Sequence, residues 1–106
     1  MGDRVFVSGT APILPGGGVD LDAAAQARRC LEIIAVALGD VGASLADVVR
    51  TRTYLIDVAD ADTVGEVHGE VFGAVRPASS MLVVAGLLDP RWRVEIEAEA
   101  IVAGDS

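Results

Sequence analysis

Residues 92–102, WRVEIEAEAIV, constrain the fold more than any other segment because apolar and charged side chains alternate along them. Successive side chains of a β-strand point to opposite faces of its sheet, so this pattern predicts a strand with one buried and one polar face. The buried face would carry Trp92, Val94, Ile96, Ala98 and Ala100, and the polar face Arg93, Glu95, Glu97 and Glu99. The chain is therefore expected to contain a sheet whose two faces differ in character.

The glutamates of that strand repel each other unless cations lie opposite them. Arg50 and Arg52 have a matching two-residue spacing in the segment 48–58, VVRTRTYLIDV, which is a second predicted strand. The pattern favours a cross-strand ladder of ion pairs between the two strands. The alternative is that one glutamate is partly shielded from water at a subunit boundary. Such shielding raises the pKa of its carboxyl group, which can then act as an acid or base.

Two amphipathic helices are expected to cover the apolar face of the sheet. The first is predicted from Asp20 or Asp22, which are good N-cap residues, to about Val41. Its core-facing stripe consists of Ala27, Leu31, Ile34 and Leu38. The second is predicted from about residues 60–62 to Phe72, with a stripe that consists of Val64, Val67 and Val71.

The segment 80–85, SMLVVA, is apolar on both faces, and a strand of this kind has to be covered twice. Two helices can cover one face of a small sheet, so another copy of the chain is the economical cover for the second face. A further strand is predicted at 4–9, RVFVSG, followed by a loop at 11–20 that is rich in proline and glycine.

Composition disfavours several classes of function. The chain of 106 residues is expected to form one domain, and its net charge of −8 disfavours nucleic acid or an anionic membrane as a partner. No apolar run approaches the roughly 20 residues that a membrane-spanning helix needs. A single cysteine, Cys30, excludes an internal disulfide, and together with the absence of a signal segment it indicates a cytoplasmic protein.

Motifs for metal binding and for nucleophilic catalysis are missing from the sequence. Cys30 and His68 are the only cysteine and histidine, and no HxxxH, CxxC or HExxH spacing occurs. No serine has the surroundings of a nucleophile elbow. We therefore expect no metal and no cofactor, and for both residues the pattern favours a structural role over a catalytic one.

Three segments, 5–12, 43–72 and 76–102, resemble the RidA family, also called YjgF/YER057c/UK114. The most specific features are the VEIEAEA ending and the Pro-Ala-Ser-Ser step at 77–80. The resemblance implies an α/β, chorismate-mutase-like (YjgF-type) fold, in which two helices pack on one face of a mixed sheet and the last strand lies antiparallel between the first two. Residues 1–106 would form a single RidA-like domain that lacks the family's N-terminal strand.

The resemblance also implies a homotrimer with small-molecule clefts between its subunits, in which enamines and imines such as 2-aminoacrylate are hydrolysed to 2-keto acids and ammonia. It assigns Glu95 to orienting the attacking water, Gly9 to the cleft lining and the backbone of Met81 to positioning the substrate. Ser79 stands where the family has an arginine that binds the substrate carboxylate, and a neutral hydroxyl cannot replace that charge-assisted fork. Arg52 is the preferred substitute cation, because it shares a face with the expected cleft wall.

Further differences from the family surround the same cleft. An asparagine and a nearby tyrosine of the second helix are Gly65 and His68 here, and the glutamine that often follows Ser-Gly is Thr10. Arg76 is a second candidate for the substitute cation. Two functions stay open, namely hydrolysis of an imine or related substrate with Glu95, and binding or protection of a small metabolite without turnover. A ribonuclease or translation-inhibitor role, also ascribed to the family, is disfavoured by the acidic charge and the missing basic groove.

Overall fold

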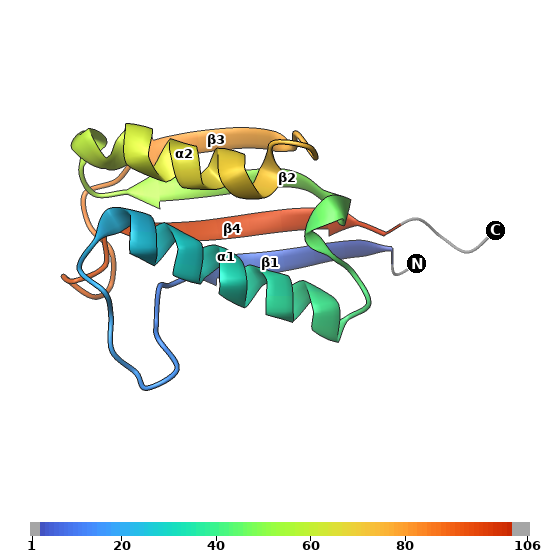
Figure 1. The fold of residues 1–106 in the computed structure, drawn as a ribbon, viewed down its shortest axis with the longest axis horizontal. Helices are drawn as coiled ribbons and strands as arrows, with labels where there is room; N and C mark the ends of the chain where they lie inside the picture. Colours follow the sequence, from blue (N-terminus) through green and yellow to red (C-terminus); the bar gives the residue numbers. More distant parts are fainter. Residues whose placement is uncertain (1–2, 103–106) are drawn as a thin grey trace.

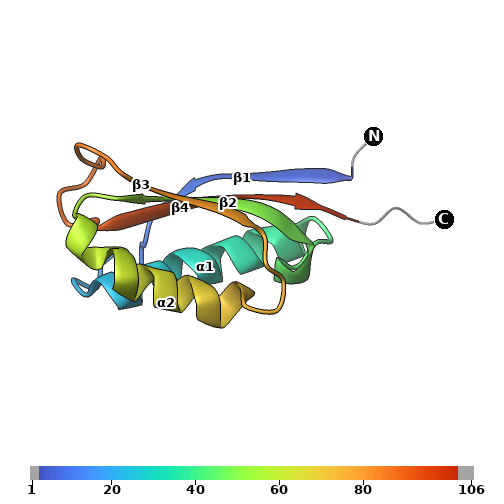
Figure 2. The ribbon, with the colours of Figure 1, turned by 90° about the horizontal axis from the view of Figure 1, so that it is seen from above.

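A computed structural model describes residues 3–102, which form a sheet with two helices packed against one of its faces (Figure 1). The strands are β1 (Arg4–Thr10), β2 (Val48–Leu55), β3 (Ala78–Val83) and β4 (Val94–Ile101). The helices are α1 (Ala23–Asp40) and α2 (Ala61–Phe72), and the 3-10 turns Leu45–Asp47 and Val58–Asp60 precede β2 and α2. Seen along its edge in Figure 2, the sheet has both helices on the same side. The predicted α/β class with helices on one face is confirmed.

The strand order is β1-β4-β2-β3. β4 is antiparallel to both of its neighbours, so the last strand lies between the first two, as the resemblance implied. β3 runs parallel to β2, with Ser79 opposite Thr51. Within the described residues, β1 and β3 therefore form the two edges of the sheet.

The bounds of all four strands differ from the prediction, and β1 differs only by the added residue Thr10. β2 ends three residues early, at Leu55, because the carboxylate of Asp57 accepts a hydrogen bond from a backbone N–H and caps a 3-10 turn. β4 begins two residues late, at Val94, because a turn anchored by Asp89 includes Trp92, whose N–H donates to the Asp89 carbonyl. β3 is displaced by two residues toward the N-terminus. In β2 and β4 a short acidic side chain competes with the strand for backbone hydrogen bonds.

The core lies between the sheet and the helices. The alternation in β4 is confirmed, because its four inward side chains are at most 2% exposed whereas the glutamates between them are half-buried on the other face. The predicted stripe of α1 is buried in full. In α2, Phe72 is buried and Val71 only half-buried, which corrects the predicted stripe at its last position.

The ends of α1 follow from the residues at its boundaries. Asp22 is the N-cap, and its carboxylate accepts a hydrogen bond of 3.0 Å from the N–H of Ala25. Beyond the helix, Gly42 adopts a φ of 82°, in the left-handed region that favours glycine. Asp22 is one of the two N-cap residues that the sequence predicted.

Cys30 is a packed core thiol, as expected. Its side chain is fully buried, and its Sγ donates to the carbonyl of Thr10 over 3.2 Å. Burial raises the pKa of the thiol to about 12, with the charge of Glu95 acting in the same direction. The thiol is therefore protonated and unreactive at neutral pH.

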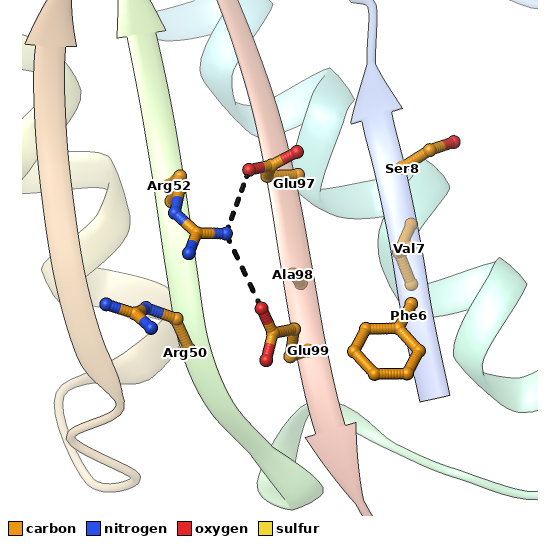
Figure 3. Close-up of a pocket in the computed structure, with 8 residues that line it drawn as sticks. All are labelled: Phe6, Val7, Ser8, Arg50, Arg52, Glu97, Ala98 and Glu99. Atoms are coloured by element: carbon orange, nitrogen blue, oxygen red, sulfur yellow. Dashed lines mark hydrogen bonds and ion pairs between the residues drawn. The ribbon is translucent and has the colours of Figure 1, made fainter. Parts of the chain in front are cut away.

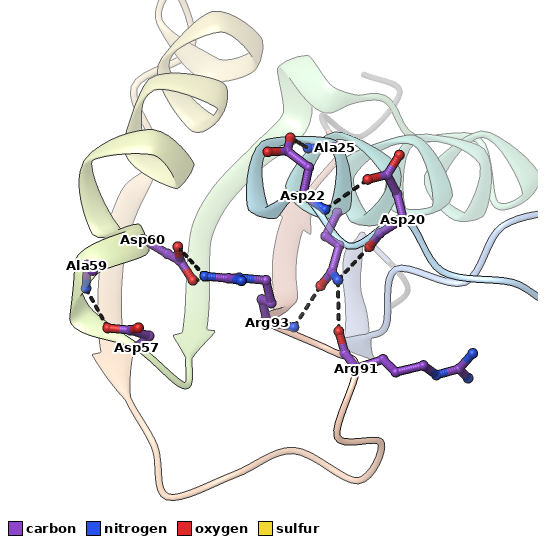
Figure 4. A network of polar contacts seen from close by, with 9 residues as sticks. Asp20, Asp22, Ala25, Asp57, Ala59, Asp60, Arg91 and Arg93 are labelled. Atoms are coloured by element: carbon purple, nitrogen blue, oxygen red, sulfur yellow. Dashed lines mark hydrogen bonds and ion pairs between the residues drawn. The ribbon is translucent and has the colours of Figure 1, made fainter.

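Gln26 is a buried polar residue that ties the start of α1 to the turn before β4. Its Nε2 donates to the carbonyls of Asp20 and Arg91 at 2.7 and 2.9 Å, and its Oε1 accepts from the N–H of Arg93 at 2.7 Å. The guanidinium of Arg93 in turn forms two hydrogen bonds, of 3.0 and 2.9 Å, with the carboxylate of Asp60 (Figure 4). These contacts join both helices to β4 at one end of the sheet. The sequence analysis did not identify them.

We expect Gln26→Ala to lower the free energy of unfolding by about 3 kcal/mol, because it removes the partner of three backbone groups at a buried site. The matched control is Glu32→Ala on the exposed side of α1, which loses only a surface ion pair with Arg29 and should cost less than about 1 kcal/mol. Urea denaturation of both variants measures the difference. Equal losses in the two variants would contradict the structural role of Gln26.

Candidate functional site

The helix-free face of the sheet carries the three glutamates of β4 in register with three side chains of β2. The pairs are Glu99–Arg50, Glu97–Arg52 and Glu95–Tyr54. A cavity of about 230 Å³ lies on this face over β4, between β1 and β2 (Figure 3). Of the predicted site residues, only Arg52 lines it. The helix-free face is thus polar along its centre.

The predicted ladder of ion pairs forms around Arg52 alone. Its Nη1 lies 3.2 Å from Glu97 Oε1 and 3.5 Å from Glu99 Oε1, and all three side chains are between 28% and 35% exposed. Arg50 makes no ion pair with any residue between 3 and 102, and Figure 3 shows it extending toward β3. One guanidinium therefore bridges two carboxylates, and the ladder is confirmed in part.

Tyr54 extends this network toward Glu95. Its hydroxyl donates to Glu97 Oε1 over 2.7 Å, so Glu97 accepts from a guanidinium and a phenol at once. The hydrogen bond to Glu97 holds the phenolic proton and raises the pKa of Tyr54 above its ordinary value. Glu95 has no such partner among the described residues.

Gly9 lies directly beside the carboxylate of Glu95. β1 contains a bulge here, because two residues, Ser8 and Gly9, stand opposite the single residue Glu97 of β4. A Cβ at position 9 would overlap Oε2 of Glu95, so only glycine leaves the space in which this carboxylate lies. The structure thus brings together two of the predicted site residues, at a kind of irregularity that is common next to active sites.

Ser79 and Met81 lie on the opposite face of the sheet from Glu95. They are in register with Thr51 and Thr53, whose side chains are buried beneath the helices. Glu95 is in register with Tyr54 on the helix-free face, and β2 separates β3 from β4. Within one chain, Ser79 and Glu95 therefore do not share a site. Arg52 also faces away from Ser79, so its role as a substitute cation stays a prediction.

Ser79 takes part in a hydrogen-bonded chain that the sequence analysis missed. Thr51 Oγ1 lies 3.3 Å from the hydroxyl oxygen of Ser79 and 2.8 Å from Nε2 of His68. The imidazole packs on the ring of Phe72 with 4.7 Å between ring centroids, and burial lowers the pKa of His68. The chain links α2, β2 and the edge strand β3, so only the strand register and the docking of α2 could reveal it.

β3 is an exposed edge with free backbone groups. Val84 donates its N–H to the carbonyl of Leu55, and because successive residues of a strand turn their backbone groups to opposite sides, those of Met81 point away from β2. The side chains of Met81, Leu82 and Val83 are 37%, 45% and 54% exposed. Residues 3–102 leave this apolar strand exposed on both faces. On the other strands of the described residues, the large exposed apolar side chains are Phe6, Val49 and Ile101.

Residues 3–102 contain neither a candidate metal-binding cluster nor a membrane-spanning helix. No group of three or more His, Cys, Asp and Glu side chains in this range could hold a metal ion. No helix of the same range is long and apolar enough to cross a membrane.

We expect Tyr54 to titrate above its ordinary pKa of 10.0, because the hydrogen bond to Glu97 holds the phenolic proton and ionisation would place a second negative charge beside that carboxylate. Tyr54 is the only tyrosine, so the phenolate absorbance reports it alone. Glu97→Gln should return the pKa toward its ordinary value, whereas Glu99→Gln, which removes a carboxylate that does not contact Tyr54, should leave it raised. Since the folded pKa is the higher one, this hydrogen bond stabilises the fold below the ordinary pKa and is lost as the pH rises through the folded value. A pKa at or below the ordinary value would contradict this geometry.

Comparison with known proteins gives one consistent family. The family model described as Endoribonuclease L-PSP matches residues 1–102. The crystal structure of Rv2704 from Mycobacterium tuberculosis, a member of the YjgF/YER057c/UK114 family, is 48% identical, covers 96% of this chain and 81% of its own, and has a TM-score of 0.88. Escherichia coli TdcF with bound serine is 32% identical, with 97% and 84% of the two chains covered and a TM-score of 0.91.

A relative whose name states its reaction has a sequence identity to this chain similar to that of TdcF. The 2-iminobutanoate/2-iminopropanoate deaminase of Escherichia coli (strain K12) is 35% identical over 106 residues, which are 95% of this chain and 81% of that protein. The matched regions include the Gly9 bulge and the strand that carries Glu95, because the family model extends over both. The sequence pattern, the strand order and these matches agree, and the chain belongs to the RidA (YjgF/YER057c/UK114) family.

Proposed function

We propose that this protein binds a small molecule in clefts between the subunits of a homotrimer and hydrolyses an enamine, imine or related C–N substrate there. The observation that carries the proposal is the position of Glu95, whose half-buried carboxylate lies over the Gly9 bulge without a hydrogen-bond partner among residues 3–102. A carboxylate in this state can accept a proton from, or orient, a water molecule. The similarity to a 2-iminobutanoate/2-iminopropanoate deaminase supports the reaction class.

The position of the site between subunits is supported by the division of its residues between two faces. Ser79 and the outward backbone of Met81 belong to the edge strand β3, whereas Glu95 lies two strands away on the opposite face. Residues so placed can contact one ligand only if two copies of the chain supply them. The exposed apolar side chains of β3 would then be covered by the neighbouring copy.

For the hydrolytic step the protein has to hold a water molecule and orient the substrate toward it. The water oxygen adds to the imine carbon while one water proton moves to the imine nitrogen. The resulting carbinolamine then collapses to a carbonyl compound and releases ammonia. Glu95 would hold the attacking water, and the Arg52–Glu97–Tyr54 network beside it neutralises the neighbouring carboxylate. Met81 would contribute backbone hydrogen bonds to the substrate.

Binding without turnover is the second candidate function, and Ser79 is the observation that favours it. The hydroxyl provides no charge to fix a substrate carboxylate in the orientation that attack by water requires. The similarity to TdcF, whose structure was determined with bound serine, supports binding of a small molecule by this chain. A protein that binds without turnover would show ligand-dependent thermal stabilisation and no product.

We expect Ser79→Arg to raise the rate of 2-imino acid hydrolysis, because a guanidinium can form two charge-assisted hydrogen bonds with the substrate carboxylate. The gain should be about 2–4 kcal/mol of transition-state binding, or roughly 30- to 1000-fold. Ammonia release is measured with the imine generated in place by an amino-acid oxidase. The control is the double variant Ser79→Arg with Glu95→Gln, which should lose the gain.

Three outcomes of this experiment are informative. If the parent protein already hydrolyses 2-imino acids as fast as Ser79→Arg does, serine at position 79 does not limit the reaction of carboxylate substrates. A gain that survives Glu95→Gln would remove Glu95 from the reaction. If neither the parent nor Ser79→Arg exceeds the rate in buffer, hydrolysis is excluded and the binding function is left.

We also expect a solution mass of three times that of the chain, measured by light scattering during size-exclusion chromatography. Leu82→Glu, which places a charge on the exposed apolar strand β3, should shift the protein toward smaller species because the charge would be buried in the assembly. The control is Val36→Glu, an equally apolar exposed position on α1, which should leave the mass unchanged. A monomeric parent protein would contradict the shared clefts.

A further inference from the structure

We infer that Ser79, Thr51 and His68 act together as an uncharged anchor for the ligand, and that the cleft selects a ligand with a neutral amide group over one with a carboxylate. This inference rests on the proposed function, since it names the class of ligand for the same cleft. It is carried by the hydrogen-bonded chain that ends at the exposed hydroxyl of Ser79.

The chain runs from the helix layer to the edge of the sheet. His68 is half-buried on α2, Thr51 is fully buried on β2, and Ser79 is exposed on β3. The distances along it are 2.8 Å between the imidazole nitrogen and the threonine oxygen and 3.3 Å between the two hydroxyl oxygens. Packing against Phe72 holds the imidazole in place. Ser79 is therefore the only member that presents its polar group to a ligand.

The chain can run in either direction. A neutral imidazole carries its proton on either ring nitrogen, and the single proton of Thr51 can go to His68 or to Ser79. When Nε2 donates to Thr51 and Thr51 to Ser79, the proton of Ser79 is free for the ligand. When Ser79 donates inward, its oxygen is free to accept. An amide offers both a donor and an acceptor and fits both states, whereas a carboxylate can only accept.

Charge also separates the two ligand classes. No arginine or lysine of residues 3–102 forms a hydrogen bond or ion pair with Ser79, Thr51 or His68. Burial lowers the pKa of His68 and so favours the neutral imidazole, which contacts the hydroxyl of Thr51 and the ring of Phe72. A carboxylate that leaves water for such an anchor loses hydration without gaining a cation, and a neutral amide loses much less.

The test compares pyruvamide with pyruvate, which have the same skeleton and differ in the neutral or charged end group. Isothermal titration at neutral pH should show the parent protein binding pyruvamide at least about tenfold more tightly than pyruvate. Ser79→Arg should reverse this preference. Thr51→Val keeps the shape of the side chain but breaks the chain, and should weaken pyruvamide binding about fivefold with little effect on pyruvate.

The matched control is Thr53→Val, the next inward threonine on β2. Thr53 is fully buried, and its hydroxyl has no hydrogen-bond partner among the described residues, so its loss should leave both affinities unchanged. If Thr51→Val behaves like Thr53→Val, the chain is not the anchor. If the parent prefers pyruvate, the inference is overturned, and loss of that preference in Arg76→Ala would identify the cation responsible.

The outcomes also distinguish this inference from the proposed function. If Ser79→Arg binds pyruvate but the parent shows no preference for pyruvamide, only the uncharged anchor is wrong. If neither the parent nor Ser79→Arg binds either probe, the shared cleft itself is wrong and the inference falls with it. Nitrogen chemical shifts of the His68 ring give a separate readout, because loss of the Ser79 hydroxyl in Ser79→Ala should change the balance of the two tautomers.

Discussion

The burial of one face of β4 is the constraint on which the rest of the structure depends. This strand lies between β1 and β2, and its inward side chains include the small residues Ala98 and Ala100, which let α1 pack closely. Since every second residue is then a glutamate on the other face, the helices are confined to one side of the sheet. The polar network around Arg52 and the position of Glu95 are direct consequences of this alternation.

Much of the fold could be predicted because its signals are local and periodic. The alternation of β4, the stripe of α1 and the cap at Asp22 each depend on residues a few positions apart. The strand order came from the resemblance to a family and could not be read from the periodicity of any one segment. The errors in β2 and β4 have a common cause, because Asp57 and Asp89 bind nearby backbone groups, so that β2 ends early and β4 begins late relative to their sequence patterns.

The candidate site was predictable to the extent that its residues lie on neighbouring strands. Gly9 and Glu95 lie together because β1 and β4 pair, and the ladder prediction already contained the Arg52–Glu97 contact. Arg52 was also the preferred cation for binding a ligand carboxylate. In the single chain, however, its guanidinium is already engaged in the ion pairs of the ladder. The contacts of Ser79 could not be predicted, because they depend on a parallel strand register and on the docking of a helix, neither of which leaves a local pattern.

The buried thiol of Cys30 has a practical consequence. It is the only cysteine, it lies under the pairing of β1 with β4, and it stays protonated at any physiological pH. Thiol reagents attack the thiolate and need access to the sulfur, so the folded chain should resist them. The rate at which such a reagent labels Cys30 therefore reports how often the contact between α1 and β1 opens in the native protein. The measurement needs no engineered probe and changes no residue on the surface where a ligand would bind.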